Sequence, residues 1–165
     1  MHAADFALLR DGGLALFWSP QVLTEVENEL HSLGYDAARL EAAQWDGTSM
    51  HGHIAAALDF PDYYGQNLNA LADCLGDVAH GDYGWDCHRT GLVVTVEGFA
   101  AFHRRDPDLA QALADSLAAA SARALLFGHR ILWLLHADDP KFRLASVGAF
   151  SVPWNGREWL ASKRG

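Results

Sequence analysis

The sequence has few cysteines and no long apolar run. Cys74 and Cys87 are its two cysteines among 165 residues, whereas small secreted domains built on disulfides need several pairs. No run of about 18 apolar residues could span a membrane, and residues 1–6 lack the basic start and apolar run of a secretory leader. We therefore expect a cytoplasmic protein with reduced thiols and no membrane association.

Basic residues are also scarce. Twelve Lys and Arg stand against twenty-one Asp and Glu, which gives a formal net charge of −9. Such a chain lacks the cationic surface that neutralises nucleic-acid phosphates, so direct nucleic-acid binding is disfavoured. The same charge favours a basic protein partner, because complementary fields raise association rates.

The common motifs of enzymes and metal sites are missing as well. The sequence has no Gly-x-Ser-x-Gly elbow, no phosphate-binding loop and no dinucleotide fingerprint. Its nine histidines form no His-x-x-x-His pair, and its cysteines form no Cys-x-x-Cys pair. We expect a protein that is not an enzyme and that holds neither a metal nor a cofactor.

Short apolar runs alternate along the chain with segments of helical periodicity. Predicted strands cover 13–18, 37–45, 92–96 and 131–135. Predicted helices cover 19–33, 48–58, 67–78, 99–103 and 107–126. The run 37–45 is rich in alanine and also compatible with a helix, and Thr48 is the expected cap of the helix after it. The alternation predicts an α/β fold with a small, mostly parallel sheet and helical crossovers.

The chain end follows a different pattern. Ala145, Val147 and Ala149 alternate with more polar residues, and a turn is expected at 153–156. Alternation beside a turn is typical of a hairpin. We therefore predict an antiparallel edge hairpin within 142–159.

The predicted helix 67–78 has two faces of different character. Helical spacing assigns Leu68, Leu71, Leu75 and Val78 to a buried stripe. The opposite face carries Asn69, Ala72, Asp73, Gly76 and Asp77. Small side chains allow another protein to approach the helix closely, and the charges on this face are negative. The pattern favours a compact anionic surface for a protein partner.

Two tyrosines precede this helix. Gly65 follows Tyr63 and Tyr64 and can adopt a positive φ, which would allow a sharp turn. We expect Tyr63 to be exposed and Tyr64 to pack toward the core. Asn67 is the expected N-cap, with any partner contact secondary. A purely structural turn and helix remains the alternative interpretation.

The thirteen residues 63–75, which begin Tyr63-Tyr64-Gly65-Gln66-Asn67, resemble the signature of the barstar family. The order of predicted elements is also similar to that family from residue 37 to residue 136. The resemblance implies a single barstar-like domain over 1–165. In it an N-terminal strand–helix unit (1–36) precedes the core (37–136), and a C-terminal extension (137–165) follows.

Members of this family inhibit a ribonuclease by inserting the helix into its active site, where carboxylates take the place of RNA phosphates. The resemblance implies an immunity-type inhibitor, monomeric when free, of a small basic ribonuclease or related toxin. The partner-binding residues that it implies are Tyr63, Gly65, Asn67, Asn69, Ala72, Asp73, Gly76 and Asp77. Among these, Asp73 is the leading phosphate mimic.

Three positions depart from the family pattern. Asn69 stands where the family has a second acid, Ala72 where it has a Trp, and Arg123 approximately where it has a further Glu. Asp77 and the acidic, aromatic loop 82–86 are candidates to compensate. The departures predict a target other than barnase itself, or a barstar-like module for a partner that is not a ribonuclease.

Overall fold

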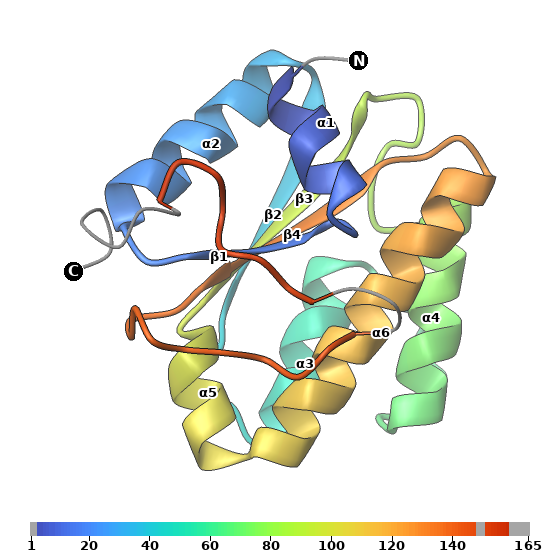
Figure 1. Ribbon diagram of the computed structural model, residues 1–165. Helices are drawn as coiled ribbons and strands as arrows, with labels where there is room; N and C mark the ends of the chain where they lie inside the picture. The colour runs from blue at the N-terminus through green and yellow to red at the C-terminus, as the bar shows by residue number, and fades with distance from the viewer. Residues whose placement is uncertain (1–2, 148–150, 159–165) are drawn as a thin grey trace.

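The computed structural model describes residues 3–147 and 151–158. Its elements are α1 (Ala3–Arg10), β1 (Leu14–Phe17), α2 (Pro20–Ser32), β2 (Tyr35–Glu41), α3 (Gly47–Ala57), α4 (Leu68–His80), β3 (Gly91–Glu97), α5 (Phe99–Arg105), α6 (Pro107–Leu126) and β4 (Ile131–His136) (Figure 1). The four strands form one parallel sheet in the order β1-β4-β3-β2. The predicted α/β fold with a parallel sheet is confirmed.

Helices cover both faces of the sheet. α1 and α2 lie on one face, and α3, α4 and α6 lie on the other (Figure 1). Strand β3 serves both layers: Leu92 and Val94 belong to the larger core beneath α3–α6, and Val93 belongs to the smaller core beneath α1 and α2. Burial on both faces explains why this strand is a continuous apolar run in the sequence.

Several element boundaries differ from the prediction. Helix α1 was not predicted. Strand β2 begins at Tyr35, directly opposite Gly91, and ends at Glu41 rather than at residue 45. Helix α3 is capped by Asp46 and not by Thr48. Asp46 accepts a hydrogen bond from the Ser49 amide at 2.8 Å, and its own amide donates to Ser49 Oγ at 2.9 Å. This reciprocal pair satisfies two donors that a lone Thr48 cap would leave open.

The C-terminal segment lies along the free edge of β1. Trp154 forms a parallel bridge with Leu16, whose amide donates to the Pro153 carbonyl at 2.8 Å. The Asn155 amide donates to the Leu16 carbonyl at 2.9 Å. The predicted antiparallel hairpin is therefore wrong for the described part of 142–159. The predicted hairpin position Ala149 lies outside the described residues.

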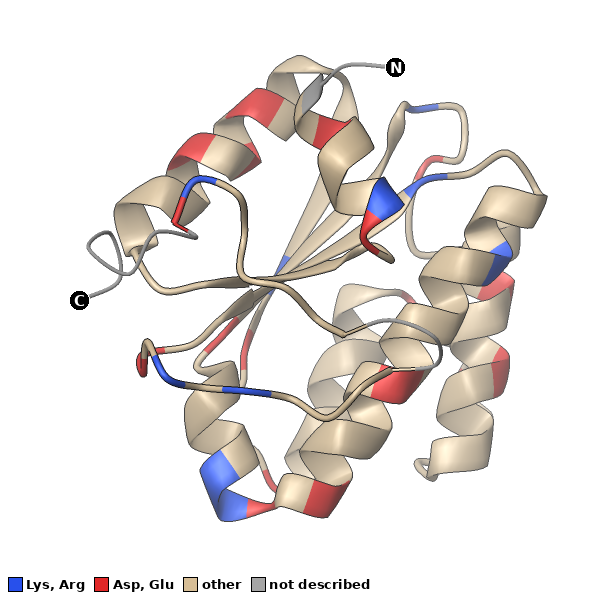
Figure 2. Cartoon of the chain, in the orientation of Figure 1, with Lys and Arg blue, Asp and Glu red and all other residues tan. Residues whose placement is uncertain are grey.

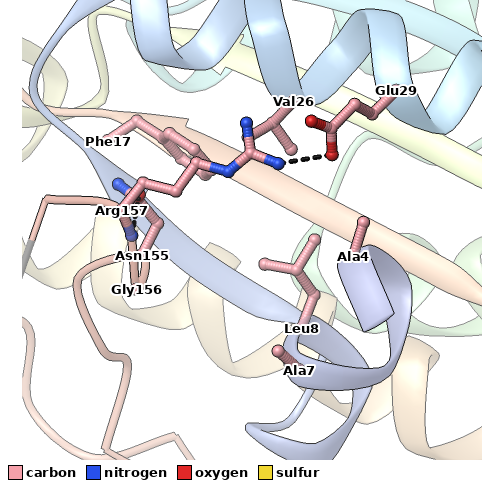
Figure 3. Close-up of a pocket in the computed structure, with 9 residues that line it drawn as sticks. All are labelled: Ala4, Ala7, Leu8, Phe17, Val26, Glu29, Asn155, Gly156 and Arg157. Carbon is pink, nitrogen blue, oxygen red and sulfur yellow. Dashed lines mark hydrogen bonds and ion pairs between the residues drawn. The ribbon is translucent and has the colours of Figure 1, made fainter. Parts of the chain in front are cut away.

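A buried carboxylate fixes this segment to the start of α2. Glu158 is 1% exposed and accepts hydrogen bonds from the amides of Ser19 (2.7 Å) and Trp18 (2.9 Å). Arg157 pairs with Glu29 beside a cavity of about 320 Å³ between α1, α2 and the C-terminal segment (Figure 3). Both terminal segments thus pack against the same sheet.

Within the described residues, no helix combines the length and the apolar character that crossing a membrane would need.

Candidate functional site

The turn before α4 is held by Asn67. Its side chain accepts a hydrogen bond from the Ala70 amide at 2.8 Å, so the predicted N-cap is confirmed. The left-handed residue of the turn is Gln66 (φ 50°), and the prediction that Gly65 supplies the positive φ is wrong. A Cβ at Gly65 would lie 3.2 Å from the amide nitrogen of the Asn67 side chain, a tight contact that a shift of this side chain would have to relieve.

The two tyrosines of the turn point to different environments. Tyr63 is 83% exposed, as predicted. Tyr64 is half-buried, with its ring edge-on to Phe60 at 4.9 Å between centroids and its hydroxyl hydrogen-bonded to Nδ1 of the buried His51. Burial raises the pKa of Tyr64 to about 12. Tyr64 therefore anchors the turn and leaves Tyr63 free for a partner.

The body of α4 packs through a stripe that is shorter than predicted. Leu71, Leu75 and Val78 are buried together with Cys74, but Leu68 is 41% exposed. Leu68 is the first helical residue, and the chain before it does not cover it. The predicted stripe is therefore wrong at this one position, which adds an apolar side chain to the exposed surface.

On the opposite side of α4, Asn69, Ala72 and Asp73 are exposed. The carboxylate of Asp73 has no hydrogen-bond or ion-pair partner among the described residues. Its neighbours on this face are small, so a second protein can reach it without displacing a large side chain.

Asp77, one turn further along, is less available. Its carboxylate accepts a hydrogen bond from the Tyr83 hydroxyl at 3.0 Å, and that hydroxyl also approaches the Cys74 carbonyl at 3.4 Å. Burial and this bonding raise the pKa of Tyr83. Asp77 therefore holds the loop after α4 in place, which leaves Asp73 as the unpaired acid of this helix face.

The loop after α4 uses its aromatic rings internally. Trp85 donates from Nε1 to the Val78 carbonyl at 2.8 Å and stands edge-on to His129. Tyr83 and Trp85 are both half-buried, whereas the acids Asp82 and Asp86 of the same loop are exposed. The exposed pair His80–Asp82, at 2.9 Å, remains on the surface.

Gly76 lies where α4 meets α6. A Cβ at Gly76 would be 3.7 Å from Cζ of Arg123, so the guanidinium lies against this glycine. Figure 2 shows the blue segment near the C-terminal end of α6 beside the red segments of α4. Arg123 is exposed and has no partner among the described residues. The face therefore holds one unpaired anion and one unpaired cation.

Two features of the site were not predicted. His51 lies on α3, and nothing in the local sequence connects it with Tyr64. Leu125, Leu126 and Phe127 are exposed at the end of α6, and the Phe127 ring stands edge-on to His80 of α4 at 4.5 Å. The sequence did contain a signal for this apolar triplet, because three consecutive apolar residues at the end of a helix cannot all face one core.

The face from residue 63 to residue 77 is suited to a protein partner. The cavities beside α1, α6 and the end of β2 are lined by other residues. No group of three His, Cys, Asp or Glu side chains in the described part of the chain could hold a metal ion. What the surface offers is the exposed ring of Tyr63, small side chains and an unpaired charge at Asp73, as in a protein interface.

Comparison with known proteins agrees with this geometry. The family described as Barstar (barnase inhibitor) matches residues 37–139, more than half of the chain, from β2 to just beyond β4. A Bacillus subtilis (strain 168) protein named "Putative ribonuclease inhibitor YrdF" is 62% identical over 26 residues. That alignment covers 16% of this chain and 29% of the relative's length. The chain belongs to the barstar family.

Proposed function

We propose that this protein inhibits a small basic ribonuclease in the cytoplasm. In this proposal the turn 63–67 and the exposed face of α4 cover the nuclease active site, and Asp73 takes the place of an RNA phosphate. The observation that carries the proposal is the exposed, unpaired carboxylate of Asp73 amid small side chains.

Electrostatics support this mode of binding. A nuclease active site that binds phosphates is cationic. Its charged donors can replace the hydrogen bonds to water that a carboxylate loses when it is inserted there. The protein's net charge of −9 also attracts a basic partner over a distance. The other proposed contacts are Tyr63 and Leu68 at the entry of α4, with Asn67, Asn69 and Ala72 beside them.

A second candidate function is a barstar-like module for a partner that is not a ribonuclease. The observation that favours it is Arg123, which places a positive charge on the same face. Failure to inhibit any ribonuclease, together with binding of a different protein, would support this alternative.

The test is an RNA-cleavage assay with barnase and other small basic ribonucleases, run with the intact chain. We expect Asp73→Ala to weaken inhibition by more than about 2 kcal/mol, roughly 30-fold, as for a central interfacial charge. Asp139→Ala removes an exposed acid after β4 and serves as the control. Equal losses in the two variants would contradict the proposed role of Asp73.

A further inference from the structure

Arg123 differs from the other arginines of the described chain. Each of the others donates to a carboxylate or to a backbone carbonyl: Arg10, Arg39, Arg104, Arg130 and Arg157 to carboxylates, and Arg89, Arg105 and Arg143 to carbonyls. Arg123 has no such partner within the described residues. In a chain with a large excess of acids, an arginine left unpaired on the binding face is available to an outside acceptor.

Few acceptors for the Arg123 guanidinium lie near it within the described residues. Its guanidinium lies against Gly76, between the two acids of α4 along that helix. Asp77 is already bonded to Tyr83, and Asp73 lies beyond ion-pair distance. A protein that covers α4 would therefore also remove Arg123 from water, and a buried guanidinium needs an acceptor to offset its desolvation.

Apolar side chains extend this surface past Arg123. Leu126 is 83% exposed and Phe127 is 44% exposed, at the end of α6. At the other end of the face are Tyr63 and Leu68. Exposed apolar and aromatic groups around a few charges are typical of a protein interface.

We propose that Arg123 is a specificity-determining residue that selects a ribonuclease carrying an acidic group on the rim of its active site. This inference rests on the proposed function. The carboxylate of the partner pairs with Arg123, apolar rim residues cover Leu126 and Phe127, and the cationic centre receives Asp73. A ribonuclease whose rim is cationic meets a like charge at Arg123 and binds less tightly.

The experiment uses barnase as the probe and measures the inhibition constant of the full chain and of Arg123→Glu. A basic ribonuclease repels the guanidinium of Arg123 and attracts a carboxylate at that position, so we expect the charge reversal to strengthen inhibition at least about tenfold at low salt. Added salt should reduce the gain. Lys141→Glu changes the net charge equally at an exposed site after β4, and we expect less than about a twofold effect.

Each outcome decides one of the two proposals. Inhibition that strengthens with Arg123→Glu and not with Lys141→Glu supports the role of Arg123. If the unmodified chain inhibits and Arg123→Glu improves inhibition no more than Lys141→Glu does, that role is overturned. The proposed function then still stands. If neither the chain nor Arg123→Glu inhibits barnase or any other small basic ribonuclease, the proposed function fails as well. Arg123→Gln, measured beside an unfolding curve, provides a neutral variant should Arg123→Glu not fold.

Discussion

At the scale of single residues, we expect a substitution at Gly76 to stabilise the fold and to weaken binding. A methyl group there would meet Arg123 at 3.7 Å, an ordinary contact, so the folded helix accepts alanine. Glycine inside a helix is about 1 kcal/mol less favourable than alanine. We expect Gly76→Ala to raise the free energy of unfolding by about 0.5–1 kcal/mol and to weaken ribonuclease inhibition about tenfold, because the methyl keeps the partner away.

A matched control exists in α3. A Cβ at Gly52 would meet nothing within 4 Å, and Gly52 lies outside the proposed interface. Gly52→Ala should raise stability similarly and leave inhibition unchanged. The measurements are urea unfolding and the inhibition constant for each variant. Inhibition that Gly76→Ala leaves intact would remove Gly76 from the interface.

His51 makes the turn before α4 sensitive to pH. Burial lowers the pKa of His51 below its ordinary 6.5, and the imidazole is hydrogen-bonded to the Tyr64 hydroxyl. The unfolded chain therefore takes up this proton at a higher pH than the folded protein does. The contribution of neutral His51 to stability is complete above about pH 6.5 and decreases as the pH falls through 6.5 toward the lowered value.

Urea unfolding at about pH 7.5 and about pH 5.5 measures this effect, and we expect lower stability at the acidic value. His51→Gln should reduce the difference between the two conditions. Burial lowers the pKa of His103 as well, so His103→Gln should remove a further part. If the difference in stability between the two pH values is unchanged in both variants, other titrating groups control it.

At the scale of elements, Asn67 is the N-cap of α4 and also lies in the proposed interface. We expect Asn67→Ala to lower the free energy of unfolding by about 1 kcal/mol, because the Ala70 amide loses its acceptor. Asn67→Ser keeps a capping oxygen and should restore most of that loss. The inhibition constant of Asn67→Ser then shows the role of Asn67. Normal inhibition means that Asn67 acts as a cap alone. Weaker inhibition at normal stability means that Asn67 also contacts the partner.

The elements that were predictable from the sequence are those specified by local chemistry. Strand β3 is a continuous apolar run, and α6 begins at Pro107 with Asp106 as its N-cap, so both lie close to their predicted places. The C-terminal segment was misassigned because its contact with β1 is made at Trp154, inside the predicted turn 153–156, and not by the alternating residues before it. That contact depends on Leu16, more than a hundred residues away.

The same distinction holds within the binding face. The cap at Asn67 and the exposure of Tyr63 follow from adjacent residues and were predicted. The pairing of Asp77 with Tyr83 and the contact of Gly76 with Arg123 depend on how a loop and a second helix pack against α4. Periodicity within one helix carries no information about such partners, so the number of free charges on the face required the structure.

At the scale of the whole molecule, the residues outside the family match build a second layer. Phe17 and Leu30 belong to the core that covers Val93 and Leu132 on the face of the sheet away from α4. Burying each such side chain is worth about 1.5–3 kcal/mol. The terminal segments therefore contribute to stability, while the proposed interface lies in the family-matched part.

Glu158 tests this separation of stability from binding. Its buried carboxylate accepts hydrogen bonds from the backbone of Trp18 and Ser19 and from the Asn155 side chain, and so holds the C-terminal segment to the start of α2. Replacing Glu158 by Ala leaves these donors without that acceptor, and we expect a loss of about 2 kcal/mol in the free energy of unfolding. Because α2 lies across the sheet from α4, the inhibition constant should not change where both proteins are folded (Figure 1). The comparison requires urea unfolding and inhibition assays on one preparation of each protein. A Glu158→Ala protein that is fully folded but inhibits weakly would show that the second layer shapes the binding face, so that stability and binding are not separate.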